Sequence, residues 1–370
     1  MSFPSLDKSA TMGGGILRLI TVKNGVISRE NKKYTLLCLH IHGIFFLSRE
    51  KVTHIQKARC NLLLQKYTRN REWNQITAAF IDKHISHLMQ KRFWECGTWL
   101  EFYANREVDK VKVSRANFCK NRFCPMCAWR QAKKDALKIG VMMDYIEAEH
   151  KKAFIFVTFT APNVKADELK QEITRYNQAF KNLVKRDIVA RMNHGYIRKL
   201  EVTYNEKRKD YHAHFHCVFA LNASYFTDRT YIKQEKWLEL WRDVMKDERI
   251  TQVDVRRVKK SESGKDISEI AKYAAKDSDY THSQDVFDSF YNALKGRQVL
   301  TYNGLFATAN KKFKAHELDD YISPDNTEYC YILLYRWGKG EYIEHERREL
   351  TSEEMETINM RLMDETDIED

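Results

Sequence analysis

The sequence predicts an α+β protein built on an antiparallel sheet with helices packed on one face. Apolar runs rich in β-branched and aromatic residues alternate with segments of helical apolar spacing, in the order β, α, β, β, α, β, α. Two of these runs flank a polar turn at 205–210, which is typical of a hairpin and makes the centre of the sheet antiparallel. A hydrophobic share of 43%, with only 13 Gly and 4 Pro, indicates a folded chain.

Each predicted element has a local signal. The first strand, AFIFVTFT, is stopped by Pro162, and the last strand alternates valines with charged residues. The helices are recognised by apolar residues three and four positions apart. In chain order, the strands are expected at 153–160, 196–204, 211–221 and 250–258, and the helices at 167–186, 233–246 and 269–280.

The chain before residue 153 is read in two parts. Apolar residues recur at helical spacing over 74–93, which predicts an amphipathic helix directly before a cysteine-rich block. The first 75 residues match no motif, so an accessory module and an over-long gene start both remain open. The expected regions are 1–75 of unknown role, a helical and zinc-binding module at 76–145, the sheet domain at 146–315, and a C-terminal region with an acidic tail at 316–370.

The charge of the chain is unevenly distributed. The total is +12, but from Glu344 onward eleven acidic residues oppose three arginines, which is −8 and leaves +20 on the preceding chain. A body this basic indicates a polyanionic partner, most simply nucleic acid, because each neutralised phosphate releases counterions. A protein that merely stays soluble away from its isoelectric point is the alternative. The tail is either a solvated helix or a disordered extension.

The N-terminal residues carry no secretory signal, since no basic segment is followed by an apolar block and a cleavage site. The apolar stretch at 34–47 contains two His and one Gly and has about 14 residues, too few to span a bilayer. We therefore expect a cytoplasmic protein, in which the eight cysteines are reduced or bound to metal.

Three histidines alternate within one predicted strand. Because successive side chains point to opposite faces, His212, His214 and His216 share one face, while Phe215 and Cys217 pack behind it. Imidazole is the commonest metal-binding side chain, and three at period two offer convergent nitrogens. The pattern predicts a metal site, with a solvated polar strand face as the alternative.

The segment from Glu269 to Tyr280 combines three reactive side chains. On one helix, Glu269 and Tyr273 share a face, and Lys276 and Tyr280 lie close to it. Such a group can attack a phosphodiester, activate water and balance charge. A tyrosine is a weak nucleophile at its usual pKa, so it needs a metal or a base, which the histidines could supply. The alternative is an ordinary helix whose Tyr273 packs on the core.

A second metal site is predicted in the cysteine-rich block. Cys96, Cys119, Cys124 and Cys127 offer four thiolates, with a close Cys-x-x-Cys pair, as tetrahedral Zn²⁺ requires. Six basic residues surround it and are either a DNA-contacting platform or a solvated rim. They are Arg115, Lys120, Arg122, Arg130, Lys133 and Lys134.

Taken together, these motifs resemble the replication initiators of rolling-circle plasmids, in the HUH endonuclease superfamily. The similarity covers roughly 96–313 and rests on the His-Phe-His run at 214–216, the strands FIFVTFTAPNV and GYIRKLEVTYN, and the segment AKYAAKDSDY at 271–280. It implies a five-stranded antiparallel sheet flanked by helices, preceded by a zinc module with four cysteine ligands. One departure is Ala213, where the family usually has Pro; it leaves the alternation of histidines intact.

The resemblance also implies a reaction. The protein would nick one strand at the double-strand origin, with Tyr273 forming a 5′-phosphotyrosyl link and Glu269 activating water for the closing hydrolysis. The three histidines would hold Mg²⁺ or Mn²⁺, with Glu201 on the neighbouring strand as a further oxygen ligand, and such a mixed set suits Mn²⁺ at least as well as Mg²⁺. Tyr280 is the competing nucleophile, although Asp277 to Asp279 is typical of a helix end.

Two other functions remain open. One is a relaxase or single-strand transposase that uses the same residues for transfer, and the other is a non-catalytic, zinc-dependent DNA-binding regulator. The resemblance implies plasmid DNA, a host helicase, a single-strand-binding protein and a DNA polymerase as partners, and no membrane.

Overall fold

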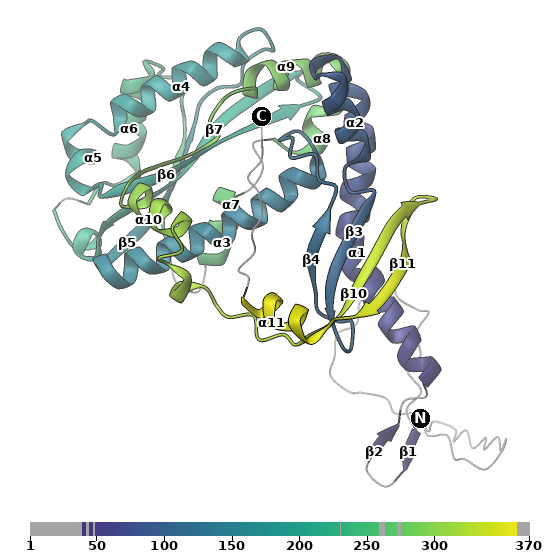
Figure 1. Ribbon diagram of the computed structural model, residues 1–370. Helices are drawn as coiled ribbons and strands as arrows, with labels where there is room; N and C mark the ends of the chain where they lie inside the picture. Colours follow the sequence, from purple (N-terminus) through teal and green to yellow (C-terminus); the bar gives the residue numbers. More distant parts are fainter. Residues whose placement is uncertain are drawn as a thin grey trace, which may run out of the picture. The chain divides into compact units, whose positions relative to one another are not determined.

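The computed structural model describes residues 39–41, 44–46, 49–229, 231–258, 263–271 and 275–360 (Figure 1). The chain divides into two compact units, residues 1–63 with 107–109 and residues 64–106 with 110–370. The first contains a short antiparallel hairpin of β1 (Leu39–Ile41) and β2 (Ile44–Phe46). Helix α1 (Arg49–Ile81) begins in the first unit and continues into the second.

The second unit is centred on a five-stranded antiparallel sheet, as the sequence predicted. Its strand order is β8-β5-β7-β6-β9, and the β6–β7 hairpin pairs Asn205 with Asp210 at the turn. The strands are β5 (Lys152–Thr160), β6 (Gly195–Asn205), β7 (Asp210–Asn222), β8 (Val253–Arg257) and β9 (Leu300–Gly304). The strand pattern found the first four, whereas β9 is a short edge strand without an apolar alternation.

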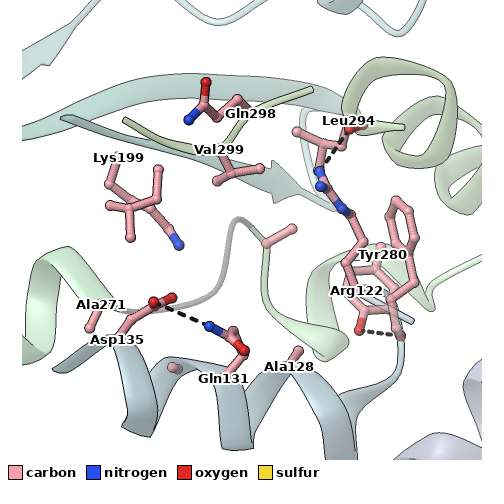
Figure 2. Close-up of a pocket in the computed structure, with 14 residues that line it drawn as sticks. Arg122, Ala128, Gln131, Asp135, Lys199, Ala271, Tyr280, Leu294, Gln298 and Val299 are labelled. Atoms are coloured by element: carbon pink, nitrogen blue, oxygen red, sulfur yellow. Dashed lines mark hydrogen bonds between the residues drawn. The ribbon is translucent and has the colours of Figure 1, made fainter. Parts of the chain in front are cut away.

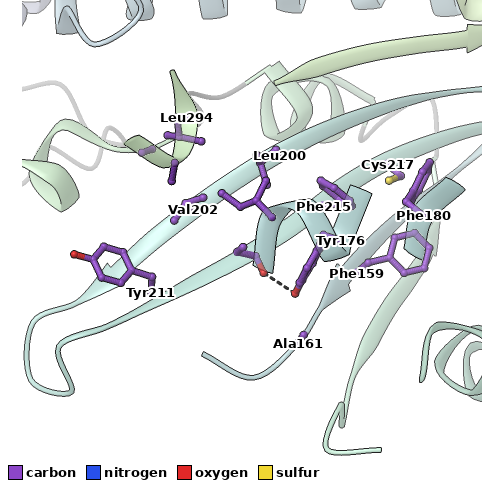
Figure 3. Close-up of a cluster of buried hydrophobic side chains, with 14 of the residues drawn as sticks. Phe159, Ala161, Tyr176, Phe180, Leu200, Val202, Tyr211, Phe215, Cys217 and Leu294 are labelled. Carbon is purple, nitrogen blue, oxygen red and sulfur yellow. Dashed lines mark hydrogen bonds between the residues drawn. The ribbon is translucent and has the colours of Figure 1, made fainter. Parts of the chain in front are cut away.

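One face of this sheet carries a core of aromatic side chains (Figure 3). Phe159, Phe180 and Phe215 meet there, and the Tyr176 hydroxyl donates a hydrogen bond of 2.7 Å to the Ala213 carbonyl of β7. The helices that supply this core include α4 (Leu169–Leu183), α5 (Asp187–Met192), α6 (Gln234–Met245) and α9 (Gln284–Leu294). The short 3-10 turn η2 (Ala223–Phe226) follows β7.

Helices also cover the opposite face, so the prediction of helices on one face only was wrong (Figure 1). They are α3 (Pro125–His150), α7 (Ser263–Ala271) and α10 (Leu305–Lys314), with the turn η3 (Asp319–Tyr321) after them. Val218 and Ala220 of β7 pack against these helices. The unbroken apolar run at 217–221 was the signal for this, since a strand buried on both faces loses its alternation.

A second, four-stranded sheet has the order β11-β10-β3-β4. It joins two strands that lie between Cys96 and Cys119 with two strands of the C-terminal region: β3 (Trp99–Asn105), β4 (Val111–Ala116), β10 (Tyr329–Gly338) and β11 (Glu341–Glu349). Helix α11 (Ser352–Met360) packs against β10. Part of the acidic tail is therefore strand and helix. The boundaries at 75, 145 and 315 stay predictions.

Two predicted helices are broken. The helix expected over 74–93 consists of the end of α1, the turn η1 (Asp82–His84) and α2 (His87–Glu95), whose Ser86 side chain accepts the N-cap bond from Met89 N–H. The helix expected over 269–280 is interrupted, since α7 ends at Ala271 and α8 (Asp277–Tyr280) starts after the extended Lys276. Asp277 to Asp279 thus begin a helix instead of ending one, because short polar side chains also favour helix N-termini.

Along the described part of the chain, no helix combines the length and the apolar character needed to cross a membrane.

Candidate active site

Three predicted metal ligands meet on the face of the sheet that α3 and α7 cover. The β6–β7 register sets Glu201 opposite His214. The Oε2 atom of Glu201 lies 3.1 Å from Nε2 of His216 and 3.4 Å from Nε2 of His214. One ligand atom from each residue lies within 4.8 Å of the other two. Two imidazoles and one carboxylate at this spacing can share one divalent cation.

The surroundings of this group favour an ionised carboxylate. Glu201 is only 6% exposed. Burial alone would raise the pKa of Glu201, but the hydrogen bonds to His214 and His216 outweigh it and hold the pKa well below its usual value. Thr158 Oγ1 on β5 lies 3.2 Å from Nδ1 of His216, so it orients the ring with Nε2 toward Glu201.

His212 lies outside this group. Its ring stacks on that of His214 with 5.2 Å between centroids, and burial, followed by the nearby His214, lowers its pKa to about 4. The Cα atoms of His212 and His216 are about 13 Å apart along the strand. His212 does not belong to the group of ligand atoms that lie within 4.8 Å of one another, and a ligand role for it stays a prediction.

Lys199 also lies on this face and was missed by sequence reasoning. It pairs with His216 across the β6–β7 ladder and is 7% exposed. Burial lowers its pKa to about 8. Its side chain borders a cavity of about 220 Å³ between β6 and α3 (Figure 2). The sequence contained a sign of this position, because Lys199 is two residues from Glu201 on a predicted strand and its side chain therefore points to the same face of the sheet.

The residues predicted to react are only partly described by the structure. Tyr273 is outside the described residues, and Glu269 lies in α7. Lys276 is the extended residue before α8, so it does not continue the helix of Glu269 as predicted. Tyr280 is 4% exposed, and its hydroxyl donates to the Phe123 carbonyl at 3.2 Å. A buried phenol held in this way is poorly placed to attack DNA.

The four predicted zinc ligands form a second cluster. The Sγ atom of Cys96 lies 3.5 Å from that of Cys124 and 3.6 Å from that of Cys127, which is 3.7 Å from that of Cys119. Four sulfurs placed about 2.3 Å from a tetrahedral ion are about 3.8 Å apart, whereas a disulfide requires about 2.0 Å. The spacing therefore fits a metal and excludes disulfides among these four residues.

Nitrogen donors surround these sulfurs. The backbone N–H of Cys119 donates to Cys96 at 3.3 Å, and that of Lys120 donates to Cys127 at 3.2 Å. Lys120 adopts a positive φ of 60°, which aims its N–H into the cluster. The Asn74 side-chain amide on α1 donates to Cys124 at 3.3 Å. Hydrogen bonds from Cys119, Cys124 and Cys96 lower the pKa of Cys127 well below its usual value.

The six basic residues predicted to contact DNA do not form one uniform rim. Arg115 is largely exposed and pairs with Glu101 at 3.0 Å. Arg130 lies 3.6 Å above the Phe118 ring, and Lys133 lies 4.6 Å above the Trp129 ring. Arg122 turns inward and donates to the carbonyls of Leu294 and Arg297 at 3.1 and 2.8 Å. A DNA-contacting role for these residues, with Lys120 and Lys134, stays a prediction.

Comparison with known proteins gives a consistent result. Residues 110–343 match the family described as replication protein. A protein named "Protein rep" from Staphylococcus aureus is 50% identical over 218 residues, 59% of this chain and 95% of that protein. "Protein rep" of Streptococcus pneumoniae serotype 2 is 32% identical over 286 residues, covering 72% and 89%, and that of Bacillus amyloliquefaciens is 32% identical over 280, covering 70% and 80%. No solved structure matches the chain.

Proposed function

Because this chain belongs to the replication protein family of plasmid initiators, we propose that it starts rolling-circle replication by nicking one DNA strand at the plasmid origin. The observation that carries this proposal is the Glu201, His214 and His216 group, whose ligand atoms lie within 4.8 Å of one another. Such a group could hold a cation on the face of the sheet that α7 covers, and Tyr273 follows α7 in the sequence. The basic body of the chain suits a DNA substrate.

Glu201, His214 and His216 would hold Mn²⁺ or Mg²⁺. When bound, the ion would withdraw charge from the scissile phosphate and so make phosphorus easier to attack. Thr158 keeps the His216 imidazole oriented before DNA arrives, and Glu201 on the opposing strand β6 contacts both rings, which reduces the reorganisation needed at the moment of reaction.

Tyr273 would attack the phosphorus through its hydroxyl oxygen. The bond from phosphorus to the 3′ oxygen breaks, the tyrosine hydroxyl gives up its proton, the leaving 3′ oxygen takes up a proton to become the 3′-hydroxyl, and the 5′-phosphate stays on the tyrosine. The 3′-hydroxyl then primes synthesis. At termination, Glu269 would take a proton from the water that cleaves the phosphotyrosyl bond. Lys276 would balance the charge on the phosphate. The engaged and buried hydroxyl of Tyr280 supports Tyr273 over Tyr280.

The cysteine cluster would hold structural Zn²⁺. Four thiolates with N–H donors and no open position are typical of structural zinc sites, and the reducing cytoplasm expected from the sequence keeps such thiols available. The ion would tie the end of α2 to the start of α3, which covers the sheet near the site. A host helicase, single-strand-binding protein and polymerase would act on the nicked product.

Cleavage of a supercoiled plasmid tests the proposal. A plasmid carrying the origin of the native replicon should convert to the open circular form with Mn²⁺ and stay intact with EDTA. Glu201→Ala should remove the activity, whereas Glu206→Ala, an exposed carboxylate in the hairpin turn, should retain it. A protein that binds this plasmid but never nicks it would be a regulator. A relaxase or transposase would nick DNA but would not support a replicon that depends on this gene.

A further inference from the structure

Polar side chains line part of the cavity that Lys199 borders, near the group of Glu201, His214 and His216 (Figure 2). Lys199 reaches it from β6, while Gln131 and Asp135 reach it from α3 on the opposite side. Ala271 and Ala275, which stand on either side of residues 272–274, also border it. The remaining lining is mainly apolar and includes Ala128, Ala132, Leu294, Val299 and Leu300.

The Lys199 amine is the unusual member of this wall. It is 7% exposed, and within the described part of the chain it makes no hydrogen bond or ion pair. The nearby carboxylate of Asp135 is already occupied by Lys138 at 3.3 Å and by Gln131 at 3.2 Å. The Glu201 carboxylate, the other anion that acts on Lys199, is bound to His214 and His216. A buried cation without a direct ion-pair partner is costly, so an anion in the cavity would stabilise it.

The dimensions and walls of the cavity restrict the anion. A volume of about 220 Å³ is smaller than the roughly 300–1,000 Å³ of sites for drug-sized ligands. Arg122 also lines the cavity, but its guanidinium is bound to the carbonyls of Leu294 and Arg297. Mainly apolar walls with the Lys199 ammonium suit a group that is part flat and apolar and part anionic. A nucleoside phosphate has this chemistry, with a base for the apolar walls and a phosphate for the ammonium.

We propose that this cavity binds one unpaired nucleotide of the DNA strand, with its phosphate on Lys199 and its base between the walls of β6 and α3. The inference rests on the proposed nicking function. Lys199 is two residues from Glu201 along β6, about 7 Å in a strand. A nucleotide held here would therefore neighbour the phosphate at the metal group and fix which bond reaches Tyr273. Lys199 is a substrate-positioning residue in this scheme.

Two variants test the site from different directions. Lys199→Met removes the charge but keeps the length of the side chain, and Ala132→Leu fills the cavity from α3. Their matched controls are Lys138→Met, which changes a lysine already paired with Asp135, and Ala148→Leu, on an exposed position of the same helix. Losing an unpaired buried cation should leave the melting temperature of Lys199→Met unchanged or raised.

Binding is measured by fluorescence anisotropy with labelled random 12-nucleotide single-stranded DNA, without divalent metal. Lys199→Met should weaken binding about tenfold or more, the cost of a charge-assisted hydrogen bond, and should lower the salt slope by about 0.7, the value for one phosphate contact. Ala132→Leu should weaken binding comparably. In the wild type, 5-iododeoxyuridine in the DNA should cross-link to the α3 peptide around Ala132, and the yield should fall in Lys199→Met.

Unchanged affinity and salt slope in Lys199→Met and Ala132→Leu would overturn the proposal, as would equal losses in the two controls. Free dTMP that binds the wild type as tightly as the DNA would also overturn it, since the cavity would then serve a free nucleotide. If the wild type nicks DNA but Lys199→Met does not change DNA binding, the nucleotide site in the cavity is rejected and the proposed nicking function is kept. If Lys199→Met and Ala132→Leu weaken DNA binding but the wild type never nicks DNA, the proposed nicking function is rejected and the nucleotide site is kept.

Discussion

Asn74 supports the cysteine cluster from α1, and its replacement by alanine gives a quantitative test of that cluster. The side chain is fully buried. Its amide donates to Cys124 Sγ at 3.3 Å and to the Phe93 carbonyl at 3.2 Å, and its oxygen accepts a hydrogen bond from Arg71. Asn74→Ala therefore removes a donor to one thiolate and leaves a buried carbonyl and a guanidinium nitrogen without this partner.

The two losses are separable. Removing a group that supports a metal ligand typically costs 10–100-fold in metal affinity, which is about 1.4–2.8 kcal/mol. Each buried polar group left without a partner costs about 1–3 kcal/mol of folding free energy, with or without metal. We expect Asn74→Ala to show both the weaker Zn²⁺ binding and the lower stability.

The assay is a Zn²⁺ titration at buffered free zinc, followed by urea unfolding of the metal-free and zinc-loaded protein. Asn70→Ala is the control, because Asn70 lies one turn earlier on α1 and its exposed side chain donates to the Lys66 carbonyl of the same helix. It should change neither quantity. If Asn74→Ala lost stability but kept the wild-type Zn²⁺ affinity, the amide would be a packing group, and the reasoning about thiolate support would be refuted.

Three further outcomes are expected. Tyr176→Phe should lower the unfolding free energy by about 1 kcal/mol in urea, because one buried hydrogen bond to β7 is lost while the ring still packs on Phe215; no change would mean that this bond is neutral. Gly304→Ala should cost more than about 2 kcal/mol, since a Cβ there would lie 2.4 Å from the His194 carbonyl oxygen at a φ of 54°, and a variant as stable as the wild type would contradict this geometry. Burial alone would raise the pKa of Asp288, but hydrogen bonds from Lys83, Gln284 and His84 lower it to about 2. Its stabilisation is then present above the unfolded pKa near 4 and lost as pH falls toward 2, so the stability gap between wild type and Asp288→Asn should narrow over that range in denaturant titrations. A gap that is constant with pH would contradict this assignment.

The sheet and the metal-ligating face were predictable because they depend on local patterns. Alternation alone sets His214 and His216 on one face of β7, and the hairpin turn fixes the register that brings Glu201 to them. Similarly, the cysteine spacing was sufficient to predict a four-thiolate cluster. In the first case the residues belong to neighbouring strands, and in the second the close Cys-x-x-Cys pair is itself characteristic of a thiolate metal site.

The parts that could not be predicted depend on tertiary packing. Helix α3 covers the second face of the sheet, but no pattern in its sequence predicts that it packs there. The extended conformation of Lys276, which interrupts the predicted helix, was missed because the same short polar residues start and end helices. The cavity at Lys199 forms only where β6, α3 and α7 meet.

The central claim is that this protein cleaves DNA through Tyr273. The direct measurement is mass mapping of the peptide-DNA adduct after incubation with single-stranded origin oligonucleotides and Mn²⁺. We expect a 5′-phosphotyrosyl link on Tyr273 that is lost in Tyr273→Phe and retained in Tyr280→Phe. An adduct on Tyr280, or no adduct with an origin that supports replication, would contradict it.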